Sequence, residues 1–131
     1  MKLKTEKLEK LITENMVSNY ANVSGDFNPI HLDDEYAKNT EFKNKIVHGM
    51  LLISNITEIM FKNFGNSWNK NGTLKIKFRN PLPVDSNLET NLKIKKFDKN
   101  KDGTLYTCEV MCNDQDDNIL ISGIASVLVE E

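Results

Sequence analysis

Cysteine, histidine and metal-ligand clusters are scarce in this sequence. Two cysteines among 131 residues are too few for a disulfide framework. Cys108 and Cys112 lie an even number of residues apart within a predicted strand, so we expect two reduced thiols on one buried face. The two histidines, His31 and His48, have no compact cluster of further ligands beside them in the sequence. No metal site is therefore expected.

Charge of one sign, long apolar runs and an export signal are missing as well. A net charge of −2 and a pI near 5.7 provide no overall positive field for a nucleic-acid backbone. The apolar runs fall short of the roughly 20 residues that a membrane-spanning helix needs. The charged start MKLKTEKLEKL lacks the apolar stretch of a secretory signal. We expect a soluble, cytoplasmic protein that binds neither nucleic acid nor membrane.

Length and periodicity indicate one α+β domain covering residues 1–131. A short first strand is expected near residues 2–8. Helical periods follow at 13–23, 33–38 and 49–64, with Thr13 as the N-cap of the first. Alternating patterns then predict strands at 73–80, 88–94, 106–112 and 119–129. Helices followed by a run of strands are typical of an antiparallel sheet wrapped around an apolar helix.

Two of these predicted elements are apolar on more than one side. Apolar residues surround most of the predicted 49–64 helix, which favours burial on several sides. The predicted last strand carries Ile121 and Val127 on one face and Ile124 and Leu128 on the other, which indicates burial of both faces. Together with an open sheet edge, this pattern favours a homodimer.

The segment SGDFNPIH, residues 24–31, reads as a turn-rich loop. Asp26 and His31 bracket a rigid Asn28-Pro29 turn, so a carboxylate and an imidazole can be aimed at one point. Such a pair can activate a water molecule and supply a proton elsewhere. On spacing alone, a structural loop is the commoner interpretation, because Asp and Asn side chains readily bond nearby backbone groups.

Gly49 stands at the beginning of the predicted apolar helix. The first N–H groups of a helix have no partner within it, and the helix dipole favours negative charge there. Because glycine has no Cβ, a substrate carbonyl can approach this N–H closely, as in an oxyanion site. A glycine needed only for packing explains the residue equally well.

Taken together, YANVSGDFNPIHLDDEYAK and FKNKIVHGMLL resemble the signature of the MaoC-like, (R)-specific enoyl-CoA hydratase family. This resemblance covers roughly the first half of the chain. It implies a hot-dog fold, in which an antiparallel sheet wraps a long helix. It also implies two subunits that pair their sheets, with active sites at the dimer interface.

The resemblance also implies roles for individual residues. Asp26 and His31 are the expected catalytic pair, Asn28 helps to position the water or the pair, and the Gly49 N–H polarises a thioester carbonyl. Thr57 falls where close relatives often place a serine whose hydroxyl makes a hydrogen bond. A threonine that bonds back to its own helix is an equally good interpretation of this position.

The implied activity is reversible syn addition of water to a trans-2-enoyl thioester, giving the (R)-3-hydroxyacyl product. Coenzyme A is then part of the substrate, acyl carrier protein is an alternative carrier, and no separate cofactor is needed. A hot-dog acyl-CoA thioesterase, with Glu58 as its spare carboxylate, is the main rival interpretation. A non-catalytic module that binds acyl thioesters is the third.

Overall fold

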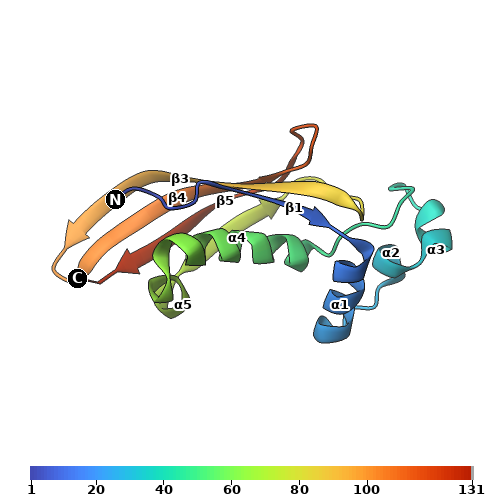
Figure 1. The fold of residues 1–131 in the computed structure, drawn as a ribbon, viewed down its shortest axis with the longest axis horizontal. Helices are drawn as coiled ribbons and strands as arrows, with labels where there is room; N and C mark the ends of the chain where they lie inside the picture. The colour runs from blue at the N-terminus through green and yellow to red at the C-terminus, as the bar shows by residue number, and fades with distance from the viewer. Residues whose placement is uncertain (131) are drawn as a thin grey trace.

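The computed structural model describes residues 1–130, which form the expected α+β architecture. Five antiparallel strands in the order β1-β3-β4-β5-β2 curve over helix α4, Gly49–Phe64 (Figure 1). The strands are β1 (Lys7–Ile12), β2 (Thr73–Phe78), β3 (Ser86–Asn100), β4 (Gly103–Asn113) and β5 (Ile119–Val129). The other helices are α1 (Glu14–Ser24), α2 (Pro29–Leu32), α3 (Asp34–Lys38) and α5 (Asn66–Asn71).

The core lies between the sheet and one face of α4. Ile56, Ile59 and Met60 of α4 are fully buried and belong to the same apolar cluster as sheet residues that include Leu88, Leu92, Cys108, Val110, Cys112, Ile121, Ala125 and Val127. Burying one large aliphatic side chain contributes about 1.5–3 kcal/mol, so this layer is the main source of stability. Cys108 and Cys112 are free and buried here, as predicted.

Burial on more than one side is found only in part within the single chain, since the adjacent Leu120 and Ile121 of β5 are both fully buried. On α4, the side chains of Met50 and Phe61 are 59% and 46% exposed, because the sheet covers only the opposite face of the helix. On β5, Ile124 is 45% exposed on the outer face of the sheet. Both elements therefore present apolar residues on their uncovered sides.

The first strand begins later than the sequence indicated. β1 covers Lys7–Ile12 and pairs with β3 from Lys7 opposite Asn91 to Ile12 opposite Ser86. The strand expected at residues 2–8 exists but is shifted, and the amide side chain of Asn63 binds the backbone that precedes it. Asn63 Oδ1 accepts from the Lys4 and Thr5 N–H groups, and its Nδ2 donates to the Thr5 carbonyl.

Two short helices were not predicted. α2 stands within the segment interpreted as a loop, with Pro29 at its first position. α5 follows Gly65, where α4 ends as expected, and its buried residue is Trp68. Its polar sequence gives no apolar period, and packing of Trp68 against Gly72 leaves no space for a Cβ at residue 72. Within residues 1–130, no helix combines the length and the hydropathy needed to cross a bilayer.

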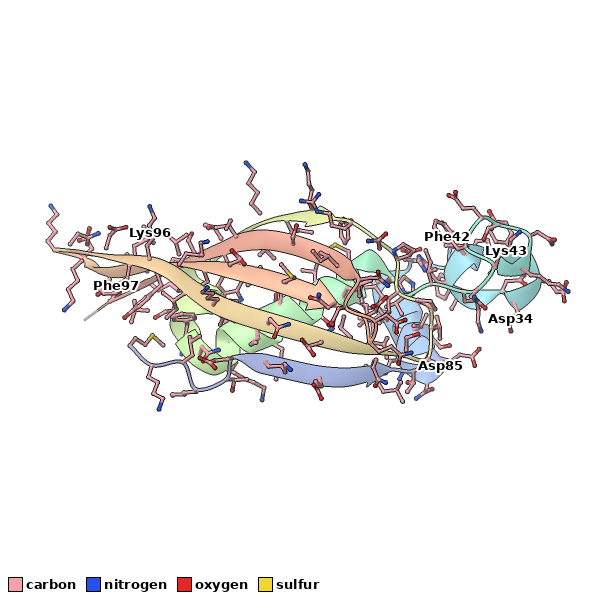
Figure 2. All side chains as sticks on the ribbon, turned by 90° about the horizontal axis from the view of Figure 1, so that it is seen from above. Asp34, Phe42, Lys43, Asp85, Lys96 and Phe97 are labelled. Atoms are coloured by element: carbon pink, nitrogen blue, oxygen red, sulfur yellow. The ribbon has the colours of Figure 1, made fainter. Side chains whose placement is uncertain are left out.

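Helices α1, α2 and α3 extend beyond one end of the sheet (Figure 1). Thr13 caps α1 as predicted, since its Oγ1 accepts from the Met16 N–H, and Gly25 ends the helix with φ +80°. Figure 2 shows Asp34 of this extension at the opposite end of the molecule from Lys96 and Phe97 of the β3–β4 hairpin. Asp85 lies between them, where the sheet meets the extension.

Candidate active site

Hydrogen bonds from polar side chains to the backbone shape the segment between α1 and α2. The Asp26 N–H donates to Ser24 Oγ, the Asn28 N–H to Asp26 Oδ1, and the Ile30 N–H to Asn28 Oδ1, each at 3.1 Å. These are the local turns that short polar side chains make with the backbone two residues on. These bonds give the polar residues of this segment a structural role. The same bonds also hold Asp26 and begin the helix that carries His31.

The loop brings Asp26 and His31 together, as their spacing predicted. Asp26 Oδ2 lies 3.9 Å from His31 Nε2, while Oδ1 is engaged by the Asn28 N–H. The Asp26 side chain is 49% exposed and that of His31 is 11% exposed. A separation of 3.9 Å is too long for a direct hydrogen bond and is of the size that one bridging water spans. The two groups can thus share a single water.

The hydrogen bond of His31 defines which of its ring nitrogens is available. His31 Nδ1 lies 2.7 Å from the Ile46 carbonyl oxygen. A carbonyl only accepts, so Nδ1 must carry a proton. In the neutral imidazole, Nε2 then has a free lone pair on the side of Asp26. His31 can therefore take a proton at Nε2 and return it from the same atom.

A short segment, residues 45–47, carries this carbonyl and is bonded on both sides. The Ile46 N–H donates to the Ile30 carbonyl of α2 at 3.1 Å. The Val47 N–H donates to the Leu82 carbonyl, and the Lys45 carbonyl accepts from the Val84 N–H. The orientation of His31 is thus linked to the chain that connects β2 with β3.

Lys45 ties this segment to α1 and α3. Its side chain is 8% exposed, and its ammonium group pairs with the Glu14 carboxylate and lies 3.5 Å from Asp34 Oδ1. The hydrogen bond to Glu14 is the main cause that raises the pKa of Lys45, partly opposed by burial. Lys45 therefore stays charged and links the starts of two helices next to the site.

A pocket of about 280 Å³ opens between the start of α4 and the end of β2. It contains both His31 and Gly49, and its other lining residues are Ile46, Val47, Leu52, Phe78, Arg79, Asn80 and Pro81. A Cβ at Gly49 would lie 2.8 Å from Phe78 Cε1, so packing accounts for the glycine. The pocket position of Gly49 at the helix start equally suits a carbonyl-binding N–H. Both interpretations of Gly49 retain support.

The two candidate polar residues inside α4 lie elsewhere. Thr57 is on the exposed side of the helix and is absent from the pocket lining, so its role stays a prediction. Glu58 Oε1 accepts a 2.6 Å hydrogen bond from Lys10 Nζ of β1. Glu58 is thus engaged away from the pocket.

Sequence reasoning did not place the end of β2 and the residues after it beside the Asp26–His31 turn. Phe78, Arg79 and Asn80 line the pocket, and the Arg79 side chain is held by a 3.0 Å hydrogen bond from Nε to Ser122 Oγ. In the sequence these residues follow the alternation of a half-buried strand. Nothing in that pattern links them to a loop about 50 residues earlier.

The expectation that no metal-ligand cluster accompanies the histidines is corrected by the structure. Asp26, His31 and His48 each offer one possible ligand atom, and these three atoms lie within 4.8 Å of one another. His31 Nδ1 and His48 Nε2 are engaged with carbonyl oxygens, so each imidazole has one nitrogen left for an ion. The three side chains could hold a metal, but nothing in their hydrogen bonds requires one.

An antiparallel sheet wrapped around a central helix, with a carboxylate and an imidazole beside the start of that helix, defines a protein of the hot-dog fold with a candidate site at that helix start. The chain belongs to the MaoC-like domain family, because the model of the "MaoC like domain" matches residues 1–113.

Relatives with known names support this assignment. The chain is 26% identical over 127 residues to a 3-hydroxybutyryl-CoA dehydratase of Methylorubrum extorquens, covering 95% of this chain and 78% of that protein. It is 27% identical over 124 residues to an (R)-specific enoyl-CoA hydratase of Rhodospirillum rubrum, covering 93% and 83%. These names denote enzymes that add or remove water, so the two relatives are hydro-lyases.

Solved structures share the fold over nearly the whole chain. The (R)-hydratase of A. caviae superimposes with a TM-score of 0.83 and 25% identity, covering 98% of this chain and 97% of that one. The R-hydratase PhaJ1 of Pseudomonas aeruginosa gives a TM-score of 0.82 at 23% identity, covering 100% and 83%, which shows the fold alone. The predicted hot-dog fold is confirmed.

Proposed function

We propose that this protein is an (R)-specific 2-enoyl-CoA hydratase, acting reversibly as an (R)-3-hydroxyacyl-CoA dehydratase. The observation that carries this proposal is the 3.9 Å separation of Asp26 Oδ2 and His31 Nε2, together with the pocket that His31 lines with Gly49. The names of two relatives that align with over nine-tenths of the chain support it.

In the proposed reaction, the thioester carbonyl lies against the Gly49 N–H. Water adds to the β-carbon, and enolate charge develops on the carbonyl oxygen, where the N–H and the helix dipole stabilise it. Asp26 and His31 together take a proton from the water and deliver one to the α-carbon on the same face. Asn28 acts by capping α2, which carries His31.

The thioesterase alternative has less support. It needs a carboxylate that directs water to the carbonyl carbon, and its candidate Glu58 is paired with Lys10 outside the pocket lining. A binding module without catalysis would not need the Asp26–His31 geometry. The hydratase is therefore the function that the site supports best.

The test is to incubate the purified protein with crotonyl-CoA and a series of longer enoyl-CoAs. A hydratase removes the enoyl absorbance without releasing a free thiol, and its product is the (R)-3-hydroxyacyl thioester. Release of thiol would instead identify a thioesterase. Binding across the series with neither change would identify a non-catalytic module.

The remaining expectations concern assembly and substrate. We propose that residues 1–131 form one MaoC-like domain that acts in the cytoplasm as a homodimer on acyl-CoA, with acyl carrier protein as an alternative carrier. Exposed apolar side chains on α4 and β5, such as Phe61 and Ile124, are the surfaces that a second copy would cover. Analytical ultracentrifugation tests the dimer, and a monomer active at assay concentration would contradict it.

A further inference from the structure

His48 contacts both members of the proposed catalytic pair. Its side chain is among the most deeply buried polar groups, at 1% exposure. Its ring stacks on that of His31, with centroids 3.9 Å apart and planes at 26°. Tyr20 covers it from another side at a centroid distance of 4.8 Å.

The same ring holds the backbone of the carboxylate. His48 Nε2 lies 3.0 Å from the Asp26 carbonyl oxygen, and because a carbonyl only accepts, Nε2 must donate. The Asp26 N–H is bonded to Ser24 Oγ and its Oδ1 to the Asn28 N–H. The bond from His48 is the contact that anchors this loop to the start of α4.

The backbone of His48 also begins the helix that presents Gly49. His48 is the N-cap of α4, and its carbonyl accepts from the Leu51 and Leu52 N–H groups. One residue therefore connects the carboxylate, the imidazole and the proposed carbonyl-binding N–H.

A histidine at this position leaves one buried polar atom without a hydrogen-bond partner in the described part of the chain. His48 Nδ1 is buried and has no hydrogen-bond partner among the protein atoms of residues 1–130. Buried polar atoms are normally paired, so an unpaired one calls for an explanation. Phenylalanine would provide a flat ring without an unpaired atom, but it has no N–H for the Asp26 carbonyl. The combination of a flat ring and a donor explains why the cost is tolerated.

We propose that His48, as the Nε2–H tautomer, is the positioning residue that fixes Asp26 and His31 relative to the start of α4. The expected kinetic effects of this inference rest on the proposed function, and the structural role of His48 does not. His48 itself does not exchange protons with substrate. Its effect is to keep the gap between Asp26 Oδ2 and His31 Nε2 at the width of one water.

Two variants separate the contribution of the His48 ring from that of its N–H donor. His48→Phe keeps a flat ring against His31 and removes the donor, whereas His48→Gln keeps an amide donor and removes the ring. We expect kcat for crotonyl-CoA to fall by up to about a hundredfold in His48→Phe, the effect of displacing a reacting group by about 1 Å. KM should change little, because the pocket lining is retained. His48→Gln should recover part of the lost kcat.

Asn113→Ala is the matched control. Asn113 also has a buried unpaired oxygen, Oδ1, but it lies on β4 outside the contacts of the pair. The kcat of Asn113→Ala should equal that of the wild type. Equal kcat in His48→Phe and the wild type would overturn the proposal. A second result would also overturn it: kcat falls and KM rises together in His48→Phe, and His48→Gln and Asn113→Ala lose as much activity.

A spectroscopic test needs neither turnover nor a stable variant. Nitrogen-15 NMR of the wild type should show the proton of His48 on Nε2, with slow solvent exchange, and ring-current shifts on the His31 ring protons. A proton on Nδ1, or a rapidly exchanging Nε2–H, would overturn the proposal. If the wild type hydrates no enoyl-CoA, the proposed function fails, while this measurement still decides the placement of His48.

Discussion

The helical extension, residues 13–48, and the body formed by the sheet and α4 are stabilised in different ways. In the body, α4 buries Ile56, Ile59 and Met60 completely against the sheet. In the extension, Asp26 is half exposed and is held by polar side chains bonded to the backbone. Water must reach the reacting groups, so the chemistry lies where burial is incomplete. Stability and activity should therefore be separable by mutation.

The largest effect is expected in the extension. Asp26→Asn and His31→Ala should each reduce the rate of crotonyl-CoA hydration by on the order of a hundredfold or more, because each removes one of two proton-transfer groups. The thermal midpoint of Asp26→Asn should stay close to that of the wild type, since Asn can keep the turn with the Asn28 N–H, whereas His31→Ala should lower it modestly because the bond to the Ile46 carbonyl is lost. Steady-state kinetics and thermal denaturation measure both. Turnover near that of the wild type in either variant would refute the site.

The opposite result is expected in the body. Ile59→Ala leaves a cavity between α4 and the sheet and should lower the free energy of unfolding by about 2–5 kcal/mol. Urea denaturation measures this change. Lys62→Ala, an exposed position on the same helix, should stay within about 0.5 kcal/mol of the wild type. Activity should be compared per folded molecule. If Ile59→Ala loses as much activity as Asp26→Asn, stability and activity are not separable by mutation.

The same contrast explains how much of the fold the sequence predicts. α4 and the later strands have strong apolar periods, and their order alone indicates an α+β domain. The elements that were misplaced depend on single long-range contacts. Asn63 binds the backbone of the segment before β1, and Trp68 packs α5 in place despite its polar sequence. Neither contact leaves a periodic signal.

The candidate site divides in a similar way. Asp26, Asn28 and His31 are predictable because one short turn brings them together. Gly49 and Phe78 meet only through the packing of α4 against β2, which no local pattern reveals. Likewise, the Ile46 carbonyl that orients His31 carries no side-chain signature.

A smaller effect is expected where extension and body meet. Lys45→Met keeps the buried stem but removes the charge shared with Glu14 and Asp34. Both carboxylates are largely exposed, so the stability loss should be about 1 kcal/mol or less. Turnover should fall several-fold, because residues 45–47 orient His31, and Lys45→Arg should restore most of it. A kcat unchanged in Lys45→Met would show that the backbone bonds alone hold this segment.

At neutral pH the smallest effect is expected from the buried thiols of the body, because their contribution to stability changes only at alkaline pH. Burial raises the pKa of Cys108 and of Cys112 to about 11, from an ordinary value of 9.0. The folded state therefore keeps two protons that the unfolded chain releases, so this contribution to stability is complete below pH 9 and is lost as the pH rises toward 11.

Urea denaturation between pH 8 and pH 10.5 should show stability falling more steeply in the wild type than in a Cys108→Ala, Cys112→Ala variant. Because alkylation requires the thiolate, iodoacetamide at pH 8 should label the folded protein far more slowly than the unfolded chain. Rapid labelling of the folded protein would mean that the sheet opens under native conditions. The body would then be no more rigid than the extension, and the contrast between the two regions would fail.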